Sequence, residues 1–406
     1  MISKGWWTLL GILFVLSLAL RYDMLFLFTV LLAFASGASV LWFRFCLHGM
    51  TYRRAFKVDR LFPGEETQLT IEVTNAKPLP LAWLLIRDGF PREVSLLTGV
   101  LGTSEPPEGP VLSLTDMLAL RWYERVHRIY RVRGDKRGVY PFGPASITSG
   151  DIFGFGTKRA VIEHIDRLVV YPKVVPVTQL GLRFERPAGE LRARRRVIED
   201  PLRMSTVREY RPGDSIRYIH WKNTARMNRL QTKVFDPSAS QVLVIFVDLQ
   251  TAPNPYSYVS EYLELILTSA ASISLYALDQ RFAVGVYANG GPRDAGHWTL
   301  VPPGRSPGQA ALILEALAPL TGFRLIPLDQ MLRRTMPSLP YGSTVMAITA
   351  RAVEPVLVSL LTLRDAGHPA VLLTVGDEEQ ETPATFTTFH LGGRDAWHRL
   401  ETLELA

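Results

Sequence analysis

An aspartate and a histidine form the densest group of reactive side chains in this 406-residue sequence. Asp214 and His220 stand in the run R-E-Y-R-P-G-D-S-I-R-Y-I-H-W-K-N-T-A-R, from Arg208 to Arg226, together with Arg217. Such a pair can move protons in a hydrolase or a transferase. The same groups beside arginines can instead form a structural cluster of ion pairs and hydrogen bonds, which is the interpretation we favour.

The sequence offers little else for catalysis. It contains no G-x-x-x-x-G-K-[ST] and no H-E-x-x-H, and its eight histidines are scattered. Its single cysteine, Cys46, can form neither a disulfide framework nor a thiolate metal site. An enzyme would therefore depend on Asp214 and His220 alone, and we predict no catalytic residues.

A turn and a helix must position this segment. Pro212 and Gly213 suit a tight turn, and Asp214 or the following serine can cap a helix that begins near Ile216. Both faces of that helix carry residues that need cover, so we expect it to be wedged between layers and to fix two domains relative to each other. This signature cluster comprises Tyr210, Pro212, Gly213, Asp214, Arg217, His220, Trp221, Lys222 and Arg226.

Positive charge is concentrated around the signature cluster. The net charge is +7, and residues 183–234 alone hold 14 Arg and Lys against 6 Asp and Glu. Such a segment suits anionic lipid headgroups or an acidic protein, whereas no nucleic-acid-binding motif accompanies it. We therefore expect no nucleic-acid partner, and a basic patch that touches anionic lipid at Arg192, Arg194, Arg195 and Arg196.

The N-terminus holds two apolar runs, residues 6–20 and 24–43, separated by three residues. Together they predict a transmembrane helical hairpin, with aromatic residues at its ends. A cleaved signal peptide is the alternative for the first run, because Lys4 precedes it and Ser17-Leu18-Ala19 resembles a cleavage site. Cations after the second run place the bulk of the chain in the cytoplasm of a multi-pass cell-membrane protein; they are Arg44, Arg53, Arg54 and Lys57.

Two folded regions follow the apolar runs. Short alternating strands separated by Pro and Gly turns predict a β-sandwich-like domain over residues 48–178. Residues 179–240 form a basic linker that includes the signature cluster. From residue 241 to 406, continuous apolar strands alternate with helices, which predicts a doubly wound α/β domain. Ligands of such sheets gather at the carboxyl ends of the strands, here at Asp248, residues 288–291, residues 349–351 and residues 376–377.

The chain resembles a bacterial family known as domain of unknown function 58. The resemblance rests on the signature run, on R-G-V-Y-P-F-G-P and D-I-F-G-F-G between Arg137 and Gly156, and on L-V-V-Y-P-K at Leu168–Lys173. It implies a membrane-anchored protein whose residues 241–406 are similar to a von Willebrand factor type A domain. It also implies a gene often found near a MoxR-type AAA+ ATPase and a transglutaminase-like protein.

Type A domains commonly bind a divalent metal such as Mg²⁺ through D-x-S-x-S after the first strand. The matching residues here are Asp248, Gln250 and Ala252, so the aspartate stands and both serines are replaced. The run Thr349-Ala350-Arg351 supplies no carboxylate either. We therefore expect this metal site to be degenerate and no cofactor to be bound, with Asp248 acting as a strand-end cap or a partner-binding residue.

These patterns favour an interaction protein over an enzyme. The leading hypothesis is a membrane-tethered adaptor that docks a cytoplasmic partner, which the resemblance suggests is a MoxR-type AAA+ ATPase. One alternative is a metal-dependent ligand-binding module of the type A class. The other is a hydrolase or transferase that uses the signature cluster.

Overall fold

The structure is a computed structural model of the chain. It describes residues 4–104, 111–151, 156–180, 204–210, 219–235, 241–254, 256–292, 296–383 and 387–405. The chain divides into two compact units. Unit 1 comprises Met1–Lys173 with Leu314–Leu320, and unit 2 comprises Val174–Ile313 with Thr321–Ala406.

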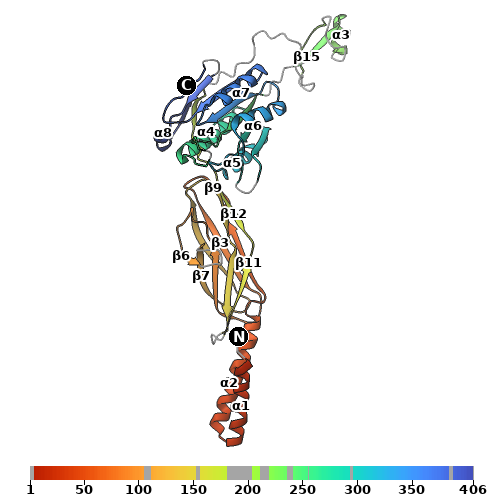
Figure 1. The fold of residues 1–406 in the computed structure, drawn as a ribbon. Helices are drawn as coiled ribbons and strands as arrows, with labels where there is room; N and C mark the ends of the chain where they lie inside the picture. The colour runs from red at the N-terminus through yellow and green to blue at the C-terminus, as the bar shows by residue number, and fades with distance from the viewer. Residues whose placement is uncertain are drawn as a thin grey trace. The chain divides into compact units, whose positions relative to one another are not determined.

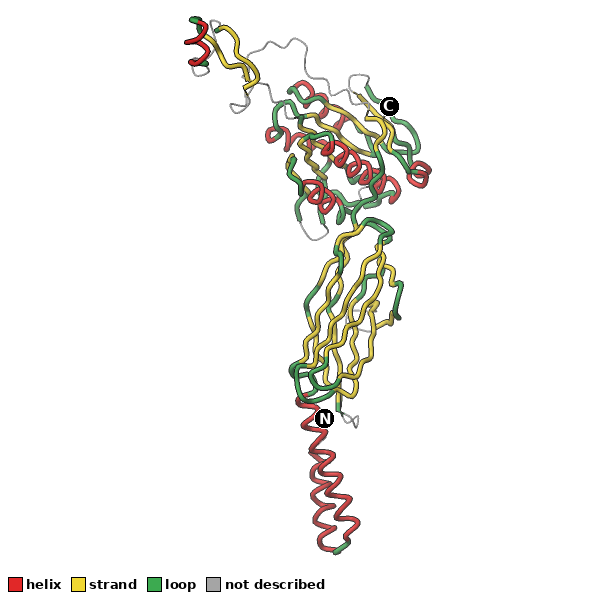
Figure 2. The backbone as a smooth tube through the Cα atoms, turned by 180° about the vertical axis from the view of Figure 1, so that it is seen from behind, coloured by secondary structure: helices red, strands yellow, loops and turns green. Residues whose placement is uncertain are grey.

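Two apolar helices begin unit 1. Helix α1 spans Lys4–Leu20 and helix α2 spans Asp23–Phe45. They lie against each other (Figure 2), and the indole Nε1 of Trp6 donates a 3.0 Å hydrogen bond to Ser36 Oγ. Among the described residues, α2 is the helix that is long and apolar enough to cross a membrane, and α1 is a shorter apolar helix.

β-Sheets make up the rest of the N-terminal part of unit 1 (Figure 1). One sheet has the strand order β1-β3-β8-β5, a second has β11-β10-β4-β7-β6, and a third has β2-β12-β9. The strands are β1 (Met50–Phe56), β2 (Arg60–Leu61), β3 (Glu66–Asn75), β4 (Leu81–Gly89), β5 (Val94–Leu96), β6 (Leu101–Ser104), β7 (Val111–Leu120), β8 (Arg125–Gly134), β9 (Gly138–Phe142), β10 (Ala145–Gly150), β11 (Thr157–Ile162) and β12 (Asp166–Val170).

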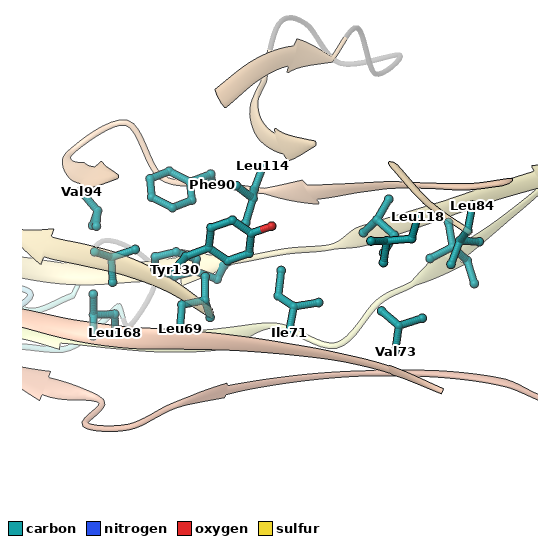
Figure 3. Packing of buried hydrophobic residues seen from close by; sticks show 14 of the residues in the cluster. Leu69, Ile71, Val73, Leu84, Phe90, Val94, Leu114, Leu118, Tyr130 and Leu168 are labelled. Atoms are coloured by element: carbon teal, nitrogen blue, oxygen red, sulfur yellow. The ribbon is translucent and has the colours of Figure 1, made fainter. Parts of the chain in front are cut away.

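The alternation seen in the sequence determines which side chains form the core. In β3, Leu69, Ile71 and Val73 are buried while the residues between them are at least partly exposed, because successive side chains of a strand point to opposite faces. These residues pack against Leu84 of β4 and Leu118 of β7 in one cluster (Figure 3). The expected β-region is therefore present, and its core lies between facing sheets.

A buried ion cluster crosses this β-region. The guanidinium of Arg54 on β1 lies 3.1 Å from the Asp88 carboxylate and 3.2 Å from the Asp166 carboxylate. Its side chain is only 1% exposed. Tyr52 donates a hydrogen bond to Asp88, and burial raises the pKa of the Tyr52 phenol. Arg54 thus ties three strands together inside the unit.

A six-stranded sheet forms the centre of unit 2 (Figure 1), with the order β18-β17-β16-β19-β20-β21. All neighbouring pairs are parallel except β17 with the edge strand β18. This is the doubly wound order, in which strands are added toward one edge of the sheet up to β18 and toward the other edge from β19 onward. The strands are β16 (Val242–Val247), β17 (Ala283–Ala288), β18 (Thr299–Gly304), β19 (Thr344–Thr349), β20 (Ala370–Thr374) and β21 (Thr387–His390).

Helices cover both faces of this sheet. Leucines of α6 and α7 pack with Val244, Phe246 and Val345 in one cluster. The alternate residues, such as Ile245, are equally buried and face the other side, where α4 contacts β16, β17 and β19. The helices are α4 (Ser260–Asp279), α5 (Gln309–Leu317), α6 (Leu328–Thr335), α7 (Glu354–Asp365) and α8 (Arg394–Arg399).

Two small sheets complete unit 2. Strand β13 (Val177–Leu180) pairs in parallel with β22 (Leu403–Leu405). Strand β14 (Met204–Glu209) pairs antiparallel with β15 (Gln231–Phe235), and helix α3 (Trp221–Met227) lies between them in the sequence. The expectation of an apolar N-terminus followed by β and then α/β regions is confirmed.

Candidate functional site

The signature segment forms a hairpin with a short helix between its strands. Ile219 makes a β-bridge with Thr232, and α3 begins only at Trp221. The predicted helix start near Ile216 is therefore wrong at Ile219, because the backbone of that residue is used in the bridge and cannot be helical. The sequence suggested capping by Asp214, whereas the capping residue of α3 is His220.

His220 makes three kinds of bond that hold the start of α3. Its Nδ1 accepts a 3.1 Å hydrogen bond from the backbone N–H of Asn223. Its carbonyl accepts from Thr224 N, and its own N–H donates to Gln231 O at 2.8 Å. A ring nitrogen that accepts from the backbone satisfies a helix-terminal donor, as an N-cap side chain does. This geometry describes a structural residue.

Only some of the other residues of the signature cluster are among those that the structure describes. Helix α3 has no buried residue, and Trp221 is 66% exposed, so the expected cover on two faces is not found for this helix. Lys222 and Arg226 are also exposed, and Tyr210 is partly buried. Four members of the signature cluster lie outside the described residues, so the interdomain role of the cluster stays a prediction; they are Pro212, Gly213, Asp214 and Arg217. The basic-patch residues also lie outside the described residues; they are Arg192, Arg194, Arg195 and Arg196.

A polar cluster lies at the carboxyl ends of the central strands of the α/β sheet. Asp248 directly follows β16 and is 4% exposed. Its Oδ1 accepts hydrogen bonds from Asn289 Nδ2 at 2.7 Å and from Gln250 N at 3.1 Å. Its Oδ2 accepts from Thr349 Oγ1 at 2.7 Å. We call these four residues the carboxyl-edge cluster.

The strand order explains why these residues meet. Strands β17 and β19 flank β16, so Asn289 after β17 and Thr349 at the end of β19 lie on either side of Asp248. Parallel strands bring their carboxyl ends to one edge. Sequence reasoning placed all three residues at this edge, Asn289 within residues 288–291, but it did not single out Asn289, whose Oδ1 also accepts from Leu249 N at 2.9 Å.

Burial dominates the electrostatics of this cluster. Desolvation raises the pKa of Asp248, while the hydrogen bonds from Thr349, Gln250 and Asn289 oppose that rise. Asp377, which follows β20, behaves differently: the backbone N–H of Arg394 donates to its carboxylate, and this bond lowers its pKa. Asp377 therefore holds the start of α8, apart from the four-residue cluster around Asp248.

The donor set of the cluster does not fit a divalent cation. Mg²⁺ takes near-octahedral oxygen ligands, usually one or two carboxylates with several waters. Asp248 supplies the one carboxylate among the four residues, and both of its oxygens already accept hydrogen bonds from the protein. No group of three or more His, Cys, Asp or Glu suited to a metal occurs among the residues that the structure describes. The cluster is suited to joining strand ends rather than to metal chemistry.

Exposed aromatic residues lie beside this cluster. Tyr258 is 44% exposed and its ring meets that of Phe323, 43% exposed, with centroids 5.8 Å apart. Leu325 is 51% exposed, and its N–H donates to Asn289 O at 2.8 Å. Tyr256, close by in the same loop as Tyr258, is 86% exposed. We call these four residues the apolar edge patch.

Sequence reasoning missed the apolar edge patch. Its residues come from two loops that are distant in the sequence, one after β16 and one before α6. The loops approach closely at Gly322, where a Cβ would overlap the side chain of Tyr258. The one local signal is the aromatic pair in N-P-Y-S-Y, which departs from the polar composition of most loops. Exposed apolar groups of this kind mark interaction surfaces.

Comparison with known proteins gives one family and one relative. Residues 206–322 match the family described as "Protein of unknown function DUF58". The uncharacterized protein YeaD of Bacillus subtilis (strain 168) is 27% identical over 231 residues, which cover 55% of this chain and 53% of YeaD. The chain thus spans about half the length of this curated relative.

Similarity to solved structures is weak. The CARDB domain of the PF1109 protein from Pyrococcus furiosus shares 11% identity over 30% of this chain and 91% of that domain, with a TM-score of 0.20. A collagen-binding domain from a Staphylococcus aureus adhesin shares 8% identity over 29% of this chain and 96% of that chain, with a TM-score of 0.19. Scores this low carry no functional information.

Proposed function

Because the chain belongs to the DUF58 family through residues 206–322, we propose that it is a membrane-anchored adaptor without catalytic activity, which docks a cytoplasmic protein at its apolar edge patch. Two neighbouring groups of residues at one edge of the sheet differ in their exposure and bonding, and this difference supports the proposal. The polar groups of the carboxyl-edge cluster are satisfied internally, while the aromatic groups beside them face solvent.

The topology supports a binding domain similar to von Willebrand factor type A. Five parallel strands with one antiparallel edge strand, β18, follow the order expected for such a domain. Ligands of open α/β sheets bind outside the carboxyl ends of the strands, where the direction of the strand order reverses. The apolar edge patch is next to that position, since Leu325 bonds to Asn289 after β17.

The residue types favour a protein as the ligand. Tyrosine and phenylalanine are enriched at protein interfaces, and they supply large contact areas with few rotatable bonds. A buried carboxylate whose oxygens are already bonded offers neither a free base nor a nucleophile to a substrate. The edge can therefore bind a partner without reacting with it.

Helix α2 supports the membrane anchor. It is apolar over 23 residues, close to the length that crosses a bilayer. In the proposal α1 crosses beside it as the second helix of a hairpin. Arg44 in the last turn of α2, with Arg53 and Lys57 after the helix, keeps the folded units in the cytoplasm. Arg54, which the sequence also counted among these cations, is buried in the β-region and contributes to packing instead.

The proposed partner is a MoxR-type AAA+ ATPase, as the family resemblance implies. The test is to crosslink the full-length protein in its native membrane with nucleotide present, to purify it in mild detergent and to identify the proteins that accompany it. We expect the ATPase to be captured by the native chain and lost with Tyr258→Ala or Phe323→Ala. Val358→Ala is the matched control, because Val358 is a 50% exposed apolar residue on α7 outside the patch.

The outcomes test the identity of the partner and the position of the docking surface independently. Failure to capture any AAA+ ATPase from the native membrane would overturn the partner. Capture that persists in Tyr258→Ala and Phe323→Ala would overturn the docking surface, as would an equal loss in Val358→Ala. A hydrolytic activity that disappears with Asp248→Asn while capture is intact would overturn the non-enzymatic role.

A further inference from the structure

We infer that the β-region of unit 1 rests on the bilayer and inserts the β7–β8 turn, Arg121–Glu124, into the lipid headgroup layer beside α2. This inference rests on the membrane anchor of the proposed function. It concerns a second contact with the membrane, made by the folded β-region rather than by the apolar helices.

Helix α2 is fixed to the β-region. Ser39, on the last third of α2, donates a 2.7 Å hydrogen bond to Asp151, which follows β10 and is 1% exposed. Cys46, which ends the helix, is 0% exposed within the core of the β-region. Lys77 donates to the carbonyl of Cys46 at 2.6 Å. These buried contacts fix the helix to the β-region, and the backbone passes directly from the helix into that region (Figure 2).

Helix α2 leaves no gap between the bilayer surface and the β-region. From Asp23 to Ser39, α2 rises about 24 Å at 1.5 Å per residue. The hydrocarbon layer of a bilayer is about 30 Å thick. Residues of the β-region already flank the helix at Ser39, while Leu41 is still 61% exposed on its other side. The bilayer surface must therefore reach the near end of the β-region.

The β7–β8 turn lies at that same end of the β-region. Asn75, which ends β3, donates from Nδ2 to Arg121 O at 2.7 Å and from its backbone to Glu124 O at 2.8 Å. The backbone N–H of Tyr123 donates to Lys77 O, and Lys77 in turn bonds the end of α2. Lys77 thus links the turn to the end of α2, where that helix leaves the membrane.

The β7–β8 turn carries two exposed aromatic side chains. Trp122 is 66% exposed and Tyr123 is 68% exposed. Tyr123 has φ of 55°, a left-handed conformation that is uncommon for a bulky residue. Glycine or asparagine would adopt it at lower cost, so the exposed ring and not the backbone accounts for this residue type. Tryptophan and tyrosine are the side chains that concentrate at membrane–water interfaces.

Basic residues lie at the same end of the β-region as the aromatic pair. Arg44 lies in the last turn of α2, Arg121 starts the β7–β8 turn, and Lys158 lies on β11, whose partner β10 leads to Asp151. All three side chains are exposed. A surface with exposed aromatic rings between basic groups suits phospholipid headgroups, because the rings enter the interface and the cations meet phosphates.

The experiment is a depth measurement in the full-length chain. The single cysteine is first replaced, Cys46→Ala, and a spin label is then attached at one position in each variant: Trp122→Cys, Lys136→Cys or Phe34→Cys. Lys136 is exposed beyond the opposite end of β8, about 33 Å away at 3.3 Å per strand residue. Phe34 is 76% exposed on α2. Collision of each label with oxygen and with a water-soluble nickel chelate is measured in liposomes.

We expect the label at 122 to collide with the nickel chelate several-fold less often than the label at 136, and the label at 34 to be reached mainly by oxygen. A label at 122 as open to the chelate as that at 136, with the label at 34 in lipid, would overturn this inference and leave the anchor standing. A label at 34 that is open to the chelate would overturn the anchor and the inference together. Thermal unfolding of each variant shows whether Cys46→Ala keeps the fold.

Discussion

The hydroxyl of Thr349 donates a 2.7 Å hydrogen bond to the carboxylate of Asp248, which joins the ends of β19 and β16 across 101 residues of sequence. Thr349 is 0% exposed and Asp248 is 4% exposed, so the bond is shielded from water. Because the carboxylate has no solvent to replace a lost donor, the stability of this sheet edge depends on the threonine.

Thr349→Val is expected to destabilise the sheet edge. The valine keeps the shape but removes the donor, which should cost about 1–3 kcal/mol. The measurement is hydrogen exchange of β16 and β19 amides in the full chain, which gives the free energy of local opening. Thr362→Val is the control, because Thr362 is exposed and its hydroxyl bonds only to its own helix. Equal exchange in both variants would contradict the role of Thr349.

The raised pKa of Asp248 predicts a pH dependence. The folded protein holds this proton more tightly than the unfolded chain, whose aspartates titrate near about 3.9. The contribution of Asp248 to stability is therefore full below that pH and is lost as pH rises through the folded pKa. Asp248→Asn should remove this fall in the opening free energy of β16, measured by hydrogen exchange corrected for intrinsic rates.

The asparagine variant can keep the local bonds. Its amide can donate to Thr349 Oγ1, whose hydroxyl can turn to the carbonyl of Arg351, 3.2 Å away. Asp365→Asn serves as the control, because the Asp365 side chain is 71% exposed, and this variant should retain the native pH dependence. If Asp248→Asn also retained the native pH dependence of the opening free energy, another group would be responsible for that dependence.

Arg54→Met is expected to destabilise the β-region strongly. It leaves the Asp88 carboxylate, 2% exposed, without its cation, and breaking a buried ion pair costs about 3–5 kcal/mol. Arg131→Met removes an exposed partner of Glu66 and should cost at most about 1 kcal/mol. Hydrogen exchange of β4 and β10 amides in the full chain distinguishes the two. Similar losses in both variants would show that Arg54 is not the central tie.

His220→Ala should loosen the start of α3. It removes the acceptor for Asn223 N, which is worth about 1 kcal/mol for an N-cap side chain, and His220→Asn should restore it. Exchange of the Asn223 and Thr224 amides is the direct measurement. A loss of some enzymatic activity in His220→Ala, with those amides still protected, would instead favour the hydrolase or transferase alternative.

Much of the fold could be predicted because it is encoded in local patterns. Continuous apolar runs such as Val242–Val247 identify buried parallel strands, and alternation in Glu66–Asn75 identifies a half-buried one. The hairpin of β14 and β15 was missed because its strands are polar and pair across a helix. The start of α3 was misplaced because helix-forming residues around Ile219 are overridden by its bridge to Thr232.

Local sequence patterns are enough to predict the apolar N-terminus, the change from β to α/β regions and the edge of the sheet at which Asp248 lies. The partners of those residues could be found only from tertiary packing. It brought Asn289 and Thr349 to Asp248, placed Phe323 against Tyr258, and buried Arg54, which the sequence counted among the cations that orient the membrane anchor. The reason is physical: periodicity is a property of neighbouring residues, whereas these contacts depend on how distant strands and loops pack.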